Sequence, residues 1–428
     1  MKGCKGLCTA YLIAELVVCS KVAASPADLF GVGTRAQGVA QTGTAFGEHD
    51  HQCYTNPALL GGRSFQHLSL GYQSVLFVTR YTAGAQHGEQ QLLTYSVLGV
   101  TLPVPFGGPL ERRLALGLSV TSPRRLVTRA KLWFPERPQF PLLTSQAESL
   151  SLTTGVGIKL SDSLSAGVGV RWLASMVGHV LIAGEDDGTT TALVQDELVT
   201  SRSPVLGLTS APLESVRLGL VWRGVQRSDL DIDVQFSDLG ALRLPDLALA
   251  GTAQYDPEQW EGEVAWLSAP WHLALALRYR RWSSFDGFLR RSVPCPRGET
   301  RCGTPEPAVP GFEDTWSPRL GGTWRMPLGR SLRATVRAGL AYEPSPVPEQ
   351  TGASNYWDNA RWLTSLGYGV SASLGGVAFD LDLALQRHWL VERSHQKDSA
   401  AAESMPDLAR VTTDGSLSLA ALELGVTF

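Results

Sequence analysis

The chain is built largely of long runs in which apolar and polar side chains alternate. Its final run, positions 422–428, reads Leu-Glu-Leu-Gly-Val-Thr-Phe and ends on the aromatic residue Phe428. Positions 361–374 and 377–390 alternate in the same way. Successive side chains of a β-strand point to opposite sides of the sheet. Each run therefore predicts a strand with one apolar and one polar face, and the fold class is expected to be all-β.

The apolar faces can meet either a protein core or lipid. A soluble sandwich or lipocalin buries them in its core, whereas a membrane barrel turns them toward acyl chains. The runs are long enough for a tilted strand to cross a bilayer, which takes about 9 to 11 residues. Their polar faces repeatedly carry charges, such as Arg337 and Asp382, which a wet interior tolerates better than a dry core does. The sequence therefore favours a transmembrane antiparallel β-barrel with a polar lumen.

The connections between runs alternate between short and long. Positions 327–330 and 375–376 are short links. Long loops are expected near 122–147, 284–315, 343–360 and 391–414. This asymmetry is typical of periplasmic turns and extracellular loops. Aromatic residues at the run ends predict two girdles in the headgroup zones: Trp282, Trp316, Tyr342, Trp362 and Trp389 beside the long loops, and Trp271, Trp324 and Phe428 at the other end.

The alternating runs predict about fourteen strands. Their positions are 66–82, 91–103, 113–121, 148–160, 164–181, 203–213, 216–236, 247–256, 271–285, 316–326, 331–343, 361–374, 377–390 and 414–428. Positions 257–270 are ambiguous, because they fit an extended strand, a long turn or a further pair of strands. The barrel is therefore expected to occupy residues 66–428.

The N-terminus is typical of a secretory signal. Lys2 and Lys5 precede an apolar stretch, and small residues up to Ala24 fit cleavage there, which gives a signal peptide at 1–24. Lipid attachment at Cys19 is an alternative, although Val18 stands where a small residue is preferred. In an oxidising compartment Cys295 and Cys302 are expected to form a disulfide. Cys53 has no obvious partner, and a buried free thiol is expected there.

Residues 25–65 lack the two-residue period and are rich in glycine, alanine, threonine and glutamine. This composition predicts an N-terminal hatch that folds into the lumen. Gly31 and Gly33 belong to a pattern that superficially fits a dinucleotide fingerprint. No strand precedes them, so turn formation is the better interpretation. A net charge of −3, with no basic stripe, gives no indication of a nucleic-acid partner.

An ordered series of short motifs resembles the FadL/TodX (OMPP1-like) family. The series comprises Asn56-Pro57-Ala58, Leu244-Pro245, Trp282-Ser283-Ser284-Phe285, Gly311-Phe312-Glu313-Asp314, Tyr342 to Pro348, and Asp358 with Arg361. The resemblance implies a fourteen-stranded barrel with an N-terminal hatch in the outer membrane of a Gram-negative bacterium. It also implies passive uptake of long-chain fatty acids or aromatic hydrocarbons with a sideways exit. One departure is Trp357-Asp358-Asn359-Ala360-Arg361, where the family often has Pro-Asp-x-Asp-Arg.

Three groups of residues are candidate functional sites. Asn56, Pro57 and Ala58 are expected to set the hatch, although the motif also fits a simple turn. Trp133, Phe134, Phe140 and Leu142 in one long loop form a possible apolar capture site, or else they pack within the loop. Arg319, Arg333 and Arg337 on polar strand faces either hold a carboxylate headgroup or brace the lumen.

Metal, cofactor and catalytic roles find weak support. Glu48, His49, Asp50, His51 and Cys53 include metal-ligand types, but adjacent residues on an extended segment point in opposite directions. A solvated hatch tip is the better interpretation, so no metal or cofactor is expected. Histidines at 272, 388 and 395 accompany many serines without any local pattern that marks a nucleophile. The chain is therefore not expected to be an enzyme.

The favoured function is an outer-membrane channel for passive uptake of hydrophobic small molecules. The expected partners are that ligand, outer-membrane lipid and lipopolysaccharide, with the protein a monomer. One alternative is a barrel that anchors or shuttles secreted proteins, which co-purification with such a protein would favour. Another is a polar porin, which predicts sizeable ion conductance where a plugged channel predicts very little.

Overall fold

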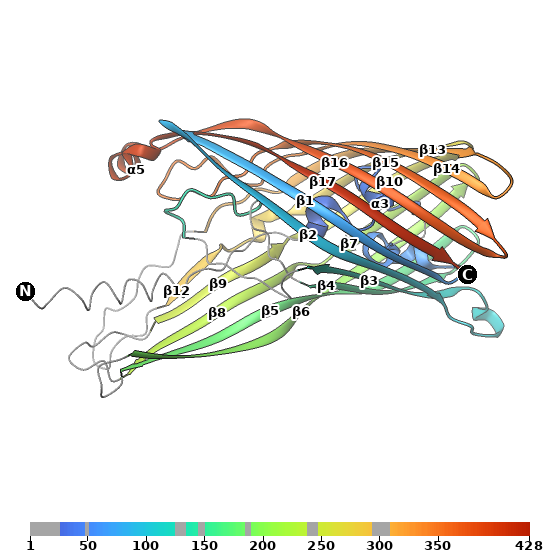
Figure 1. Cartoon of the computed structure of the whole chain (residues 1–428), viewed down its shortest axis with the longest axis horizontal. Helices are drawn as coiled ribbons and strands as arrows, with labels where there is room; N and C mark the ends of the chain where they lie inside the picture. The colour runs from blue at the N-terminus through green and yellow to red at the C-terminus, as the bar shows by residue number, and fades with distance from the viewer. Residues whose placement is uncertain are drawn as a thin grey trace, which may run out of the picture.

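The computed structural model describes residues 26–47, 51–124, 134–143, 150–184, 190–237, 247–292 and 309–428. Figure 1 shows a barrel of long tilted strands with short helical pieces in its interior. The C-terminus lies at the end that carries the tight turns, and helix α5 (Ser399–Ser404) lies at the opposite end. Several expectations fall outside the described residues: the signal peptide 1–24, Glu48, His49, Asp50, Trp133, and the disulfide between Cys295 and Cys302.

Fourteen antiparallel strands close the wall, as the sequence predicts. The first and last strands pair with each other, with Leu70 opposite Leu424, so the sheet has no open edge around the ring. In ring order the strands are β1 (His67–Ala83), β2 (Ala85–Pro103), β3 (Leu114–Pro123), β4 (Ser151–Lys159), β5 (Leu164–Gly184), β6 (Thr190–Leu213), β7 (Val216–Arg223), β10 (Glu258–Ser268), β11 (Trp271–Arg281), β13 (Thr315–Pro327), β14 (Leu332–Glu343), β15 (Arg361–Leu374), β16 (Val377–Gln396) and β17 (Arg410–Thr427).

Three further strands extend the sheet beside the ring. β8 (Gln226–Ser237) pairs in parallel with the outer part of β5, from Met176 to Ala183. β9 (Leu247–Asp256) pairs with β8, and β12 (Leu289–Ser292) pairs with β9. The loops near this end therefore contribute a small sheet of their own, visible at the lower left of Figure 1.

These three strands show that the prediction of which runs form the wall was partly wrong. The run 216–236 is two strands, 247–256 lies outside the ring, and the ambiguous stretch 257–270 contains wall strand β10. The chain leaves the wall after Arg223, where the carbonyl of Gly224 accepts hydrogen bonds from Ser203 Oγ (2.7 Å) and Arg171 Nη2 (2.8 Å). Relative to the prediction, the wall gains β10 and loses β9, so the number of wall strands is still fourteen.

The outward faces of the wall strands are apolar and the inward faces are mostly polar. Leu366 and Leu424 are 62% and 57% exposed on the outside, whereas Arg319 on an inward face is 1% exposed. Aromatic pairs run along the outer surface at the loop end, from Trp222–Trp260 and Tyr279–Trp316 to Tyr342–Trp362, while Trp271 stacks on Trp324 at the turn end. This arrangement places a lipid-facing band between two girdles. Trp282 is the exception, because a 3₁₀ turn, η3 (Trp282–Ser284), buries it among loop aromatics.

Within the described residues, none of the helices combines the length and the apolar character needed to cross a membrane. The remaining helical pieces are α2 (Pro26–Phe30), α3 (Thr34–Gln37), α4 (Gln52–Thr55), η1 (Pro57–Leu60), η2 (Gly108–Leu110) and η4 (Pro406–Leu408). We call the described residues 26–47 and 51–62 the N-terminal segment. Its pieces α3, α4 and η1 contact wall strands, and Figure 1 shows α3 inside the barrel.

Candidate functional site

Asn56 fastens the N-terminal segment to the wall. Its Nδ2 donates to the carbonyl of Thr44 (2.8 Å) and to that of Leu208 on β6 (3.2 Å). Its Oδ1 accepts from the backbone N–H of Ala58 (3.0 Å) and so caps η1. One buried side chain thus joins two parts of the N-terminal segment and one wall strand.

Paired glycines on three neighbouring wall strands lie against the Asn56-Pro57-Ala58 motif. Gly157 on β4 lies opposite Gly167 on β5, which lies opposite Gly207 on β6. A Cβ atom at Gly157 would lie 2.4 Å from the Pro57 oxygen, and one at Gly207 would lie 1.9 Å from Asn56 Oδ1. Only a wall without side chains there lets η1 approach so closely. This glycine seat, formed by Gly157, Gly167 and Gly207, was not predicted, although glycines recur on three neighbouring runs of the sequence.

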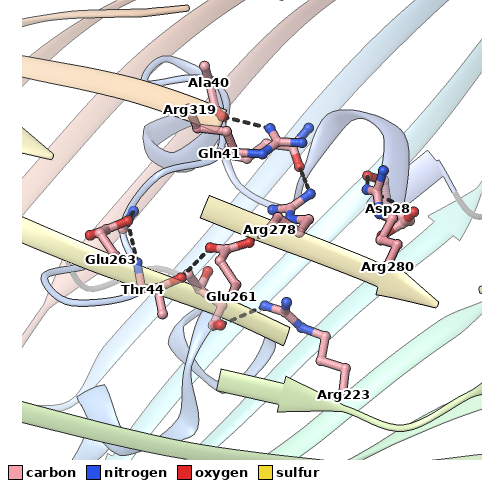
Figure 2. Close-up of polar contacts among 12 residues, drawn as sticks. Asp28, Ala40, Gln41, Thr44, Arg223, Glu261, Glu263, Arg278, Arg280 and Arg319 are labelled. Atoms are coloured by element: carbon pink, nitrogen blue, oxygen red, sulfur yellow. Dashed lines mark hydrogen bonds and ion pairs between the residues drawn. The ribbon is translucent and has the colours of Figure 1, made fainter. Parts of the chain in front are cut away.

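Two glutamates of β10 hold the middle of the N-terminal segment, as Figure 2 shows. The carboxylate of Glu263 accepts from the successive backbone N–H groups of Gly43 (2.6 Å), Thr44 (3.0 Å) and Ala45 (3.0 Å). Glu261 accepts from Thr44 Oγ1 and binds Arg278 on β11. Carboxylates that bind amide groups in this way are well satisfied although buried.

Glu423 on the last strand binds two separate points of the N-terminal segment. It accepts from Thr34 N (2.8 Å) and Thr34 Oγ1 (2.9 Å), and its Oε1 lies 2.8 Å from His51 Nε2. The other ring nitrogen of His51 lies 2.7 Å from Ser119 Oγ on β3. His51 is 2% exposed. The expectation of a solvated tip is therefore wrong for His51, because two wall strands enclose its ring.

Cys53 also faces the wall. It is a buried free thiol, as expected, with Sγ 3.6 Å from the carbonyl of Thr153. Burial raises the pKa of this thiol to about 12. The thiol is therefore protonated at neutral pH and is a poor nucleophile.

The predicted lumen arginines separate into two kinds. Arg319 and Arg337 are buried, whereas Arg333 is exposed at the turn end of β14. Arg319 donates to Glu343 and to the carbonyl of Ala40 (2.9 Å). Arg337 donates to Asp382 (2.7 Å), which also accepts from Arg35 of the N-terminal segment (2.8 Å). Both buried arginines thus join the wall to itself and to the N-terminal segment.

Glu343 is the centre of a larger ionic cluster. It pairs with Arg319 and Arg361 and lies 3.8 Å from Arg280, which in turn lies 3.0 Å from Asp28 in α2. Because each buried charge has opposite charges beside it, the cluster is tolerated in a confined interior. Its geometry couples α2 to wall strands β11, β13, β14 and β15.

Next to the ionic cluster around the ring, part of the lumen is apolar. Inward-facing side chains of β16, β17, β1 and β2 meet apolar residues from α2 and from two long loops in one buried cluster, which we call the apolar lining. It includes Leu29, Phe30, Val75, Phe77, Leu93, Tyr95, Phe140, Leu143, Trp357, Leu417 and Leu419. Phe30 packs edge-on against Phe77, with ring centroids 5.9 Å apart. The signal missed in the sequence is the loss of alternation at Val75-Leu76-Phe77-Val78, where both faces are apolar.

The predicted capture residues lie in two buried clusters. Phe140 belongs to the apolar lining and lies 5.7 Å from Trp357 between ring centroids. Leu142 belongs to a second cluster among the long loops, and half-buried Phe134 packs against it. The members of that cluster include Tyr255, Trp282, Phe285, Phe288, Phe312 and Tyr356. A role in ligand capture stays a prediction for these residues.

Asp358 lies in the loop between β14 and β15, beside the apolar lining. Its carboxyl group is fully buried, with Oδ1 4.0 Å from Arg361 Nη1. Burial raises the pKa of Asp358 to about 6, although the nearby Arg361 partly opposes the shift. This carboxyl group therefore gains a proton more readily than an exposed aspartate.

The described residues leave openings between the N-terminal segment and the wall, and two of them lie near the turn end of the barrel. One has an empty volume of about 670 Å³ and is lined by Arg35, Phe46, His272 and Thr323, among others. The other, of about 800 Å³, lies beneath η1 and is lined by residues that include Arg63 and Lys159.

Comparison with known proteins gives a consistent result. A family model described as outer membrane protein transport protein (OMPP1/FadL/TodX) matches residues 16–428. A Pseudomonas aeruginosa FadL homologue is similar in fold, with 18% identity, a TM-score of 0.60, and coverage of 93% of this chain and 98% of that one. The Pseudomonas putida toluene transporter TodX shares 14% identity, with a TM-score of 0.53 and coverage of 94% and 99%. No curated protein sequence matches the chain.

Proposed function

The chain belongs to the OMPP1/FadL/TodX family of outer membrane transport proteins, and from that premise we propose that it is a passive channel for hydrophobic small molecules. Long-chain fatty acids and monoaromatic hydrocarbons are the substrate classes to consider. A similar structure is described as a monoaromatic hydrocarbon channel, the TodX ΔS2S3 mutant, with a TM-score of 0.57 at 14% identity over 92% of this chain and 99% of that one.

The observation that carries this proposal is the apolar lining. A barrel needs apolar side chains only on its lipid-facing surface, and a polar porin wets its inner surface. Here Val75, Phe77, Leu417 and Leu419 face inward and are at most 2% exposed. Apolar area removed from water provides the binding free energy for a hydrophobic ligand.

The lining connects the loop end of the barrel with the N-terminal segment. Phe140 and Trp357 approach it from the loops, and Phe30 approaches it from α2. Phe30 also lies 4.9 Å from His388 between ring centroids. A ligand that enters between these side chains meets the N-terminal segment directly, so we propose that this segment acts as the hatch.

Retention of ligand by the purified protein tests the proposal. Native mass spectrometry after incubation with oleate, and separately with hexylbenzene, asks which class stays bound. Phe77→Ser is expected to weaken that retention by roughly tenfold or more, because a buried aromatic contact contributes a few kcal/mol.

Leu385→Ser is the matched control, because Leu385 is 58% exposed on the lipid-facing side of β16. This variant should retain ligand as the wild type does. Failure of folded wild-type protein to retain either probe would contradict the proposal, and so would equal losses in the two variants.

A further inference from the structure

The aromatic girdle at the loop end of the barrel is interrupted on one side. The row of outward-facing aromatics reaches Trp362 on β15 and Trp389 on β16, which lie opposite each other. On the next strands the corresponding positions are Ser416, Val78 and Gln90. The outer surface over β17, β1 and β2 therefore lacks the rings that elsewhere occupy the headgroup zone.

An arginine lies beside this gap, on the lipid-facing surface of β16. Arg387 follows Leu381, Leu383 and Leu385 on the outward face of β16, all of which are at least 41% exposed. It precedes Trp389 by two residues, which is roughly 7 Å along a strand. An arginine side chain is long enough to span such a distance, so a guanidinium at this position can reach the headgroup zone with its stem among acyl chains.

The guanidinium group of Arg387 can donate more hydrogen bonds than the one it makes within the described residues. Among the described residues it donates to Ser418 Oγ on β17, a neutral hydroxyl group. An arginine presents five N–H donors in a planar fork. No carboxylate in the described parts of the chain forms an ion pair with Arg387, in contrast to Arg319 and Arg337 inside the lumen.

Polar residues continue from Arg387 toward the extracellular side. Ser418, Ser416 and Asp414 follow one another on the outward side of β17, and Asp414 binds Arg80 of β1 with Oδ1 2.6 Å from Nε. We call Arg387, Ser418, Ser416, Asp414 and Arg80 the polar notch. It is bounded by Trp389 on one side and by lipid-facing leucines below.

We propose that the polar notch binds a phosphate group of lipid A in the outer leaflet. The Arg387 fork matches a phosphate bidentately, and Ser418 holds the fork in place. The leucines of β16, with Leu422 and Leu424 of β17, offer the acyl chains a surface directly below. The position near the extracellular boundary favours a lipid of that leaflet. The ion pair between Arg80 and Asp414 forms the edge of the polar notch that is nearest the long loops.

Lipid binding by the purified, delipidated full chain tests this assignment. The probes are diphosphorylated lipid A, the same lipid without phosphates, and phosphatidylglycerol, with affinities read by native mass spectrometry in mild detergent. The wild type should prefer lipid A over its dephosphorylated form. Arg387→Gln should lower lipid A affinity roughly tenfold, the loss expected for a charge-assisted hydrogen bond, and leave dephosphorylated lipid A unchanged.

The matched control is Arg330→Gln, an exposed arginine in the turn between β13 and β14 at the other end of the barrel. It should bind all three lipids as the wild type does. Arg387→Leu is a second test, because leucine suits a lipid-facing position and should preserve folding while abolishing the preference. The assignment is overturned if Arg387→Gln keeps wild-type affinity for lipid A, or if phosphatidylglycerol binds the wild type as tightly as lipid A.

Discussion

Glu423 on the last wall strand and His51 in the N-terminal segment are joined inside the barrel, with Oε1 and Nε2 2.8 Å apart. The same carboxylate binds both the N–H and the hydroxyl group of Thr34. One side chain of the wall therefore holds two points of the N-terminal segment that are distant along the chain. Gly33 makes this possible, because a Cβ atom there would lie 2.4 Å from His51 Cδ2.

Glu423→Gln is expected to loosen the N-terminal segment. The substitution removes the charge that strengthens three hydrogen bonds, each of which contributes about 1.5 to 3 kcal/mol when charge-assisted. The midpoint of thermal unfolding in detergent should fall, and single-channel conductance in planar bilayers should rise. Glu392→Gln, at an exposed position near the outer end of β16, should change neither quantity. Unchanged conductance in a destabilised Glu423→Gln protein would argue against an occluding role for the segment.

Gly167→Leu should displace the Asn56-Pro57-Ala58 motif from its seat. A Cβ atom at Gly167 would lie 2.2 Å from the carbonyl carbon of Pro57, so the backbone of η1 must move. Overpacking of this kind typically lowers the free energy of unfolding by about 1 to 3 kcal/mol. Gly262→Leu is the control, because a Cβ atom there meets nothing within 4 Å. Equal unfolding midpoints for the two variants would show that the seat does not hold the motif.

The barrel was predictable from the sequence because alternation reports the pleat of each strand directly. Which strands belong to the closed ring was harder to predict. Positions 247–256 and 258–268 are both strands, yet only the second lies in the ring. What separates them is the turn of the chain after Arg223, which depends on contacts of Gly224 with Ser203 and Arg171, residues distant in the sequence. Local periodicity carries no information on such contacts.

The interior was predictable only in part. Polar runs placed Arg319 and Arg337 in the lumen, but their partners Glu343 and Asp382 lie on other strands and follow from register rather than from pattern. The prediction of a solvated tip was wrong for His51 for the same reason. Its partners Glu423 and Ser119 lie on wall strands, far from it in the sequence. The apolar lining arises where strands are apolar on both faces, and such runs also fit an ordinary buried strand.

Alkylation of the cysteines tests whether Cys53 is enclosed in the folded protein and whether Cys295 and Cys302 are paired. Removal of residues 1–24 would leave Cys53, Cys295 and Cys302 of the six cysteines. With iodoacetamide at pH 8 the folded protein should not react, because burial raises the pKa of Cys53 to about 12 and the other two are expected to be paired. Unfolding without reductant should expose one reactive thiol, and reduction should expose all three. Rapid labelling of folded protein at Cys53 would contradict its enclosure between η1 and the wall.

Asp358 is expected to make stability depend on pH. Its folded pKa of about 6 lies above the reference value of 3.8, so the folded state binds this proton more tightly than the unfolded state does. The contribution is therefore present at low pH and is lost as the pH rises through about 6, by at most about 3 kcal/mol. Unfolding midpoints at pH 4.5 and 7.5 should decrease with pH less steeply for Asp358→Asn than for the wild type. Asp407→Asn, at an exposed loop position, should keep the wild-type slope, and an unchanged slope in Asp358→Asn would place the titrating group elsewhere.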